Sequence, residues 1–405
     1  MKRLSLIAFF VPLFALAQQG PLRVAQVQSN RPSSSPGASR AQAPVLTGVS
    51  TLPDDDREAV WDKKNLKATW RLALSGSRRE DSLANRRTGS SFAAILNSTY
   101  DLTSFVNLTV NPRAYFQNGH VQADSAKNGK SNALELSEAS ANLHWDEALQ
   151  FSVGALNQTR DLSGLVVDDL AFPAARLTLQ AGASNDSYAA LVGQTAVPTS
   201  SSLTTNSRDF EKTPSFTSGG VKSQAKLGAF TLKARAMYFE FRDLPTGIAT
   251  DAAILGNTTV QGPAAGISEF AYDYRGTEGG LGARVDFNKS FGIEVDANGI
   301  KNDGAPSELS QGYTVFTKAD LWIGSVKWSP SFEYFNVQPD ASVAYYSSSS
   351  YQTNRVGYET GLALQYKKIF RLSLSGGERD VLFETPSQSR ERFFSLSMET
   401  VDAPL

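Results

Sequence analysis

Residues 66–75 read LKATWRLALS, and apolar and polar side chains alternate along this stretch. One face of an extended chain would carry Leu66, Ala68, Trp70, Leu72 and Leu74. The opposite face would carry Lys67, Thr69, Arg71, Ala73 and Ser75. A period of two residues is typical of a β-strand, because successive side chains point to opposite sides of the backbone. The stretch therefore predicts a strand with one face suited to an apolar environment and the other to water.

Similar runs recur from residue 66 to about Met398, and short and long connections alternate between them. Short turns are expected at residues 101–104, 146–147, 185–187, 228–229, 288–290, 324–325 and 367–368. Long polar connections are expected near residues 78–87, 117–131, 157–174, 197–219, 243–275, 301–311, 337–354 and 378–390. This rhythm is typical of an antiparallel transmembrane β-barrel with short periplasmic turns and long extracellular loops. The runs predict an all-β barrel of about sixteen strands, an even number as such barrels require.

Aromatic residues favour a membrane barrel over a soluble β-sandwich or propeller, because Tyr and Trp prefer the membrane interface. One set is expected beside the short turns: Tyr100, Trp145, Phe151, Tyr188, Phe230, Phe287, Phe291, Trp328, Tyr366 and Phe370. A second set lies near the long connections: Phe116, Tyr238, Tyr313, Phe332, Tyr334 and Tyr358. Together they would form two girdles on the outer face of the barrel.

The N-terminus predicts secretion. Lys2 and Arg3 precede the mostly apolar residues 4–16, and Ala15-Leu16-Ala17 fits a cleavage site, so residues 1–17 are predicted to be a signal peptide. A permanent helical anchor is the alternative, although the apolar stretch is shorter than the roughly 20 residues that a membrane helix needs. The chain has no cysteine, which excludes thiol chemistry and disulfides.

Residues 18–60 are predicted to be a flexible periplasmic leader, and residues 61–405 the barrel. The leader is rich in Ser, Pro, Gln and Ala, a composition that cannot bury enough apolar surface to form a core. The alternatives for this segment are a tether that binds the cell wall or a partner, and a plug that fills the pore.

Charged residues on the strand faces opposite the apolar faces indicate a water-filled lumen. A Lys or Arg facing lipid at the membrane midplane costs about 2 to 4 kcal/mol, so these side chains must point inward. Examples are Lys222, Lys233, Arg284, Glu294 and Lys318. The formal net charge of −1 gives no reason to expect nucleic acid as a partner. A mean hydropathy of −0.26 suits a barrel, which needs apolar residues only at alternate strand positions.

At this point the chain resembles the sixteen-stranded porins of Gram-negative outer membranes. The most pointed similarity is the pattern LSEA at 136–139, Leu143 and LQFSVG at 149–154, which looks like the paired strands before the inward-folding third loop of porins. The resemblance implies a constriction loop at residues 157–174 that brings Arg160, Asp161, Asp168 and Asp169 to the narrowest section. It also implies a facing basic wall, for which the candidates are Arg71, Arg113 and Arg235.

The resemblance further implies an outer-membrane location, contact with outer-membrane lipid and lipopolysaccharide, and a homotrimer. One departure concerns the C-terminus. Many porins end on an aromatic residue, whereas here residues 399–405 follow Met398 and read ETVDAPL. The boundary of the last strand and the assembly signal are therefore open at this point.

Catalytic, cofactor-binding and metal-binding residues are not expected. A hydrolase would need a nucleophile or an activated water beside a base, and the chain contains two histidines, His120 and His144. His120 lies in a predicted loop, and His144 is interpreted as a solvated histidine of the lumen.

The sequence therefore predicts a porin for passive diffusion of small hydrophilic solutes and ions. A substrate-selective porin is the alternative within transport. A structural or adhesive barrel that acts through its long surface loops is the alternative outside it.

Deletion of residues 18–60 tests the leader. We expect the shortened protein to form channels of unchanged conductance in planar bilayers, because the leader has no periodic apolar face with which to join the barrel. A large rise in conductance would identify the leader as a plug, and a failure to assemble would show that it pairs with the barrel.

Overall fold

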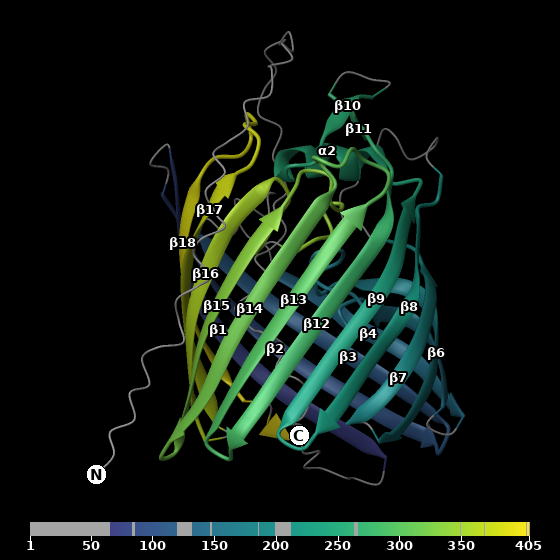
Figure 1. The fold of residues 1–405 in the computed structure, drawn as a ribbon, viewed down its shortest axis with the longest axis vertical. Coiled ribbons are helices and arrows are strands. Elements are labelled where there is room, and N and C mark those ends of the chain that lie inside the picture. Colours follow the sequence, from purple (N-terminus) through teal and green to yellow (C-terminus); the bar gives the residue numbers. More distant parts are fainter. Residues whose placement is uncertain are drawn as a thin grey trace. The chain divides into compact units, whose positions relative to one another are not determined.

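The computed structural model describes residues 65–82, 86–119, 132–145, 148–184, 186–198, 212–262, 266–348, 350–367, 369–401 and 403–404. The chain divides into residues 1–37 and residues 38–405, and all the described residues belong to the second unit. Within that unit, sixteen antiparallel strands form one closed barrel (Figure 1), which confirms the predicted fold class and strand number. The predicted signal peptide and leader lie outside the described residues.

The first half of the barrel contains β1 (Leu66–Asp81), β2 (Arg86–Thr103), β3 (Val106–Gly119), β4 (Asn132–Trp145), β5 (Leu149–Asn157), β6 (Ala171–Ser184), β7 (Ser187–Ala196), β8 (Ser215–Leu227) and β9 (Phe230–Arg242). The second half contains β12 (Tyr274–Asn288), β13 (Phe291–Asn302), β14 (Gln311–Ile323), β15 (Val326–Val337), β16 (Arg355–Tyr366), β17 (Phe370–Val381) and β18 (Glu391–Thr400). Among the described residues, no helix is long and apolar enough to span a membrane.

Pairing between the first and last strands closes the barrel. β1 is hydrogen-bonded to β2 on one side and to β18 on the other, with Ala73 opposite Glu399. A short strand, β19 (Ala403–Pro404), continues along β1, where Ala403 lies opposite Trp70. The edge of β1 is therefore paired beyond Met398, so the unusual C-terminal residues extend the last strand. Closure satisfies the backbone groups that an open sheet would expose to lipid.

Short turns and long connections alternate as predicted, and they lie at opposite ends of the barrel (Figure 1). Gly228 and Gly324 occupy two of the turns with φ values of 63° and 62°, a conformation that glycine adopts without a steric penalty. The connection between β9 and β12 contains α2 (Thr246–Leu255) and a hairpin of β10 (Thr259–Gln261) and β11 (Ser268–Phe270). The expected loop at residues 78–87 is shorter than predicted, because β1 continues to Asp81 and β2 begins at Arg86.

Pro112 occurs inside β3, where its missing N–H would interrupt a regular ladder. The pairing register with β4 shifts between Asn111 and Pro112, which marks a β-bulge. The Asn111 side chain compensates by accepting a hydrogen bond of 3.0 Å from the backbone N–H of Ser98 on β2. The proline is thus accommodated within a central strand by a local irregularity.

The outward face of the barrel is apolar and carries most of the predicted aromatic residues. Exposed members near the turns are Tyr100, Trp145, Phe230, Phe287, Trp328, Tyr366 and Phe370, and exposed members near the long connections are Phe116, Tyr238, Tyr313, Phe332 and Tyr358. The prediction that Tyr188 faces outward is wrong. Tyr188 shares the face of β7 that carries the buried residues Ala190 and Val192, so it points inward. The sequence could not indicate this orientation, because both faces of β7 are apolar.

Candidate functional site

Charged side chains on the inward face of β12 to β15 form a continuous ion-pair network. The Lys318 ammonium lies 3.0 Å from a carboxylate oxygen of Glu294, and the Arg284 guanidinium lies 3.1 Å from a carboxylate oxygen of Asp320. Lys327 also approaches Asp320, at 3.4 Å. These groups alternate in sign around the wall, so each charge has an opposite partner.

The wall continues across the closure of the barrel. Arg71 on β1 and Arg371 on β17 share the carboxylate of Glu399 on β18, at 3.6 and 4.0 Å. On the other side, Arg71 lies opposite Ile95 on β2, and Ile95 lies opposite Arg113 on β3. Arg71 and Arg113 therefore belong to one row of inward-facing positions, two strands or about 10 Å apart.

The connection between β5 and β6, residues 158–170 (loop 3), contacts distant parts of the chain. The N–H of Ser163 donates a hydrogen bond of 2.9 Å to Glu278 on β12. The N–H of Asp168 donates one of 2.8 Å to the carbonyl of Tyr346 in residues 338–354 (loop 7), which connect β15 and β16. Loop 3 is thus held by both a strand and a second loop.

An apolar cluster joins these loops to the barrel wall. It contains Leu162, Leu165, Val166 and Val167 of loop 3, Ile248 and Ala252 of α2, and Ala341, Val343, Tyr345 and Tyr346 of loop 7. The strands contribute Phe172, Val192, Ala196, Phe216, Met237, Phe239, Phe241, Tyr274, Ile300 and Val337. Fully burying one such large side chain contributes roughly 1.5 to 3 kcal/mol, so the cluster is a substantial core inside the unit.

Tyr346 lies at the centre of the cluster. Its ring stacks on Phe241 with centroids 5.4 Å apart, and it meets Phe172 edge to face at 5.3 Å. Because Phe172 belongs to β6 and Phe241 to β9, one side chain of loop 7 bridges two separate strands. Burial raises the pKa of the Tyr346 hydroxyl, so the group stays neutral.

Polar side chains fasten loop 7 to the connection between β9 and β12. The Asn257 amide donates to the carbonyls of Pro339 and Ser342 at 2.7 and 2.8 Å, and it accepts from the N–H of Ala344 at 2.7 Å. The Asp340 carboxylate accepts from the Tyr274 hydroxyl at 2.8 Å. Burial raises the pKa of Asp340, and its hydrogen bonds oppose that shift without cancelling it.

Among the predicted site residues, Arg113 and Asp169 are brought into direct contact as an ion pair. Asp169 also accepts a hydrogen bond from the Asn157 amide. Arg113 stands on β3 and Asp169 on loop 3. Arg71 is not part of this pair, because its guanidinium lies beside Glu399 instead.

Asp161 occupies a different position from the one expected. It is buried between Arg176 on β6 and Lys222 on β8, at 3.1 and 2.6 Å, rather than facing an open lumen. Burial alone would raise the pKa of Asp161, but the two cations hold it below its usual value. This carboxylate therefore anchors the start of loop 3.

The remaining predicted residues also have specific neighbours. Arg160 lies 3.4 Å from Glu138 on β4, and Arg235 lies 2.9 Å from Glu278. Asp168 is buried, and its backbone holds loop 7 as described above. Arg160 and Arg235 thus contribute to the lumen as members of ion pairs.

The sequence predicted a long connection at residues 337–354, but it did not indicate that loop 7 packs against the barrel wall, and the acidic partners Glu138 and Glu278 were missed. Two signals could have indicated this packing. Tyr345 and Tyr346 interrupt a serine-rich stretch, and the run MYFEF at residues 237–241 puts large apolar side chains on both faces of one strand. The second signal predicts that an apolar segment packs against the inward face of β9.

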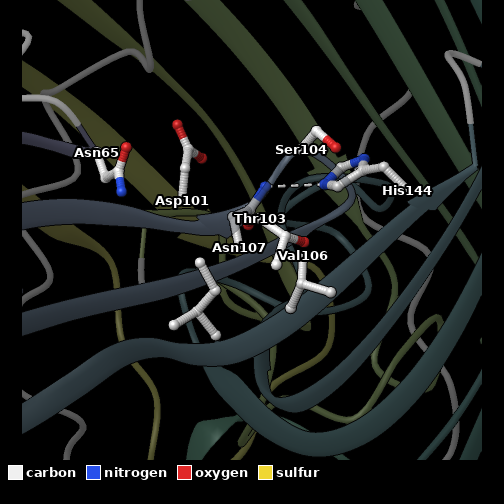
Figure 2. A pocket seen from close by; sticks show the side chains of 8 residues that line it. Asn65, Asp101, Thr103, Ser104, Val106, Asn107 and His144 are labelled. Carbon is white, nitrogen blue, oxygen red and sulfur yellow. Dashed lines mark hydrogen bonds between the residues drawn. The ribbon is translucent and has the colours of Figure 1, made fainter.

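A polar pocket of about 350 Å³ lies at the turn between β2 and β3. In Figure 2 the side chains of Asn107 and His144 face each other, and a hydrogen bond of 2.9 Å joins them. This agrees with the interpretation of His144 as an inward histidine among polar neighbours, while His120 lies outside the described residues. Within the described part of the chain, no group of three or more His, Asp or Glu residues could hold a metal ion.

The apolar cluster generates a prediction about loop mobility. Phe241→Ala would remove a ring that lies 4.5 Å from Phe216 and stacks on Tyr346, a loss that typically costs about 3 to 5 kcal/mol in a buried core. We expect faster amide hydrogen exchange in loop 7 with an intact barrel. The matched control is Phe230→Ala on the same strand, where the ring faces outward. Unchanged exchange in the Phe241 variant would contradict the anchoring role of the cluster.

Comparison with known proteins agrees with this architecture. No family model and no curated protein matches the chain. Among solved structures, OprB of Pseudomonas putida has a TM-score of 0.57 and 11% identity, and the match covers 83% of this chain and 94% of OprB. OmpF of Salmonella typhi, in complex with daunomycin, has a TM-score of 0.50 and 11% identity, covering 84% of this chain and 99% of OmpF. OmpT of Vibrio cholerae has a TM-score of 0.50 and 9% identity, covering 83% and 97%. The closed sixteen-stranded barrel, its apolar outer face and this likeness show that the chain has the fold of outer-membrane porins.

Proposed function

We propose that the protein is a channel for the passive diffusion of small hydrophilic solutes and ions across the outer membrane. The observation that carries the proposal is the row of charged residues on the inward face, from Arg113 through Arg71 to Arg371 and Lys327. Charged side chains at such positions require water, and a barrel of this strand number is wide enough to contain it.

Loop 3 forms the constriction in this proposal. Two contacts of loop 3 support this role. Asp169 contacts Arg113 on β3, and Ser163 is hydrogen-bonded to Glu278 on β12. These two strands lie far apart around the barrel. Arg160, Asp161, Asp168 and Arg235 then set the charge near the narrow section, and Arg71 contributes from the neighbouring wall.

The apolar cluster makes the route asymmetric. Loop 3, α2 and loop 7 pack against inward positions of β6 to β9, β12, β13 and β15, so in this proposal water and solutes pass through the remaining part of the barrel. A substrate-selective porin is the second candidate, because three connections rather than one narrow the same barrel. An adhesive barrel would use its long connections as exposed binding surfaces. The connection between β9 and β12 does not favour this alternative, because its α2 residues Ile248 and Ala252 are buried in the cluster.

A homotrimer in contact with outer-membrane lipid is the assembly that we propose for this channel. The barrel offers a continuous apolar outer face to lipid or to a neighbouring copy. The signal peptide at residues 1–17 and the periplasmic leader at residues 18–60 complete the proposal for secretion and assembly.

Planar bilayer recordings test the channel. Purified full-length protein should give stepwise conductance, because a charged and hydrated lumen connects the two ends of the barrel. Folding is checked by gel mobility, which should change on boiling as expected for a detergent-resistant barrel. Folded barrels that remain electrically silent would favour a structural role instead.

Ion selectivity tests the pairing of Arg113 with Asp169. Asp169→Asn should shift the reversal potential across a salt gradient toward anion selectivity, because it leaves the charge of Arg113 uncompensated. Arg113→Ser should shift it toward cations, and the double variant should return close to the wild-type value. Both shifts should shrink in concentrated salt, where the Debye length falls from about 8 Å to about 3 Å.

The control for selectivity is Lys226→Ser, which breaks an exposed pair with Asp186 beside a short turn. It should leave the reversal potential unchanged, since an exposed charge at a wide mouth is screened by salt. Single variants of Arg113 and Asp169 that behave like the wild type would show that this pair does not lie on the ion route.

A further inference from the structure

The polar pocket at the turn between β2 and β3 has no role in the constriction described above. Asp101, Thr103 and Ser104 line it from the end of β2 and the turn, and Asn107 on β3 and His144 on β4 line it from the wall (Figure 2). Its volume of about 350 Å³ lies within the range of small-molecule sites. The lining side chains supply both hydrogen-bond donors and acceptors.

The pocket continues an uncharged part of the inner wall. In the strand register Asn107 lies opposite Asn142 on β4, and His144 lies opposite Gln150 on β5. Further amide and hydroxyl side chains occupy the same row of positions on β2 to β6: Asn97, Thr99, Thr109, Ser140, Ser152 and Thr178. We call this set, together with the pocket, the neutral wall.

The neutral wall faces the lumen. The alternate positions of β3, β4 and β5 carry the exposed apolar residues Val110, Trp145 and Val153, which point outward. A solute inside the barrel can therefore reach the amides and hydroxyls of the neutral wall. The wall formed by β12 to β15 differs, because there the inward side chains form the charged network described above.

The charges at the neutral wall are balanced. Among the described residues, Asp101 is the only carboxylate that lines the pocket, and the Lys67 ammonium lies 3.3 Å from it. Toward loop 3, the cations that border the neutral wall have carboxylate partners: Arg113 with Asp169, Arg160 with Glu138 and Arg176 with Asp161. The pocket thus offers polar contacts without a net charge.

A directional chain of hydrogen bonds orients the polar groups of the pocket. The Asn142 carbonyl accepts from the Ser152 hydroxyl at 2.6 Å, so the Asn142 amide nitrogen donates to the Asn107 carbonyl at 3.0 Å. The Asn107 amide nitrogen then donates to Nε2 of His144 at 2.9 Å. Because Nε2 accepts, Nδ1 of the neutral imidazole carries the hydrogen and can donate to a solute.

We propose that the pocket binds a neutral, hydroxyl-rich solute of monosaccharide size during its passage through the channel. Hydroxyl groups both donate and accept, so they match the amide, imidazole and hydroxyl groups of the pocket. A charged solute would lose hydration here without gaining a net counter-charge. Leu102 and Val106 add apolar lining against which the C–H groups of such a solute can pack. This inference rests on the proposed channel and narrows its solute class.

Equilibrium binding to purified, folded, full-length protein in detergent tests the site. The probes are D-glucose, D-gluconate and D-glucosamine, which have similar size and differ in charge, and we expect glucose to bind most tightly. Asn107→Leu should weaken glucose binding roughly tenfold, because it removes one side chain's donor and acceptor from the pocket and frees the His144 ring. Equal glucose affinity of this variant and the wild type would overturn the proposal.

The matched control is Gln365→Leu, which removes an inward amide from β16 beside another short turn, opposite Lys327 in the register. It should leave glucose affinity unchanged, and an equal loss in both variants would refute a specific site. Folding of each variant is checked by gel mobility before and after boiling.

Asp101→Asn tests the charge balance with little change in the shape of the pocket. It leaves Lys67 uncompensated, so gluconate should now bind more tightly than glucose. The matched control, Asp186→Asn, releases Lys226 from its carboxylate at a different short turn and should keep the wild-type order. An unchanged order of affinities in the Asp101 variant would contradict selection by neutrality.

Bilayer recordings separate this site from the channel itself. Glucose should reversibly reduce the current through wild-type channels and have a weaker effect on Asn107→Leu channels. Channels that conduct but neither bind glucose nor respond to it would refute the site and leave the channel intact. Glucose binding by folded but electrically silent barrels would support the site and refute the channel.

Discussion

Every backbone N–H and C=O of a chain that crosses a membrane must find a partner, because hydrocarbon offers none. Here the pairing of β1 with β18 meets that requirement, and the rest of the structure depends on it. Closure removes both edges of the sheet and separates an outer surface from an inner one. The C-terminal residues take part, since β19 keeps β1 paired at its beginning and the Thr400 hydroxyl accepts a hydrogen bond of 3.0 Å from the N–H of Leu72.

Once the barrel is closed, strand alternation assigns each side chain to one of two environments. Leucine and aromatic residues meet lipid, while lysine, arginine and carboxylates meet the lumen, where charges of opposite sign alternate around the wall. A sixteen-stranded barrel leaves more space than its own side chains can fill. Residues of loop 3, α2 and loop 7 form an apolar cluster with inward-facing residues of β6 to β9, β12, β13 and β15. The cluster needs apolar inward residues, and this explains why Met237, Phe239 and Phe241 replace polar ones on β9.

The same alternation gives neighbouring arginines unrelated roles. Arg79 points into the lumen and pairs with Glu391, whereas Arg78 points outward and pairs with Glu80. The two faces of the wall at this end therefore meet different surroundings.

The sequence by itself determined the barrel, its strand number and the side of the wall that most residues face, because these follow from a period of two and from the spacing of turns. It failed at Tyr188, where both faces of the strand are apolar and periodicity cannot choose between them. It brought Arg113 and Asp169 together through a resemblance to porins, but it could not assign Arg71 to Glu399 or bury Asp161 between Arg176 and Lys222. The apolar cluster was also decided by the tertiary structure alone. Its residues are up to about 180 positions apart in the chain, and only closure of the barrel and the resulting strand register bring them within contact distance.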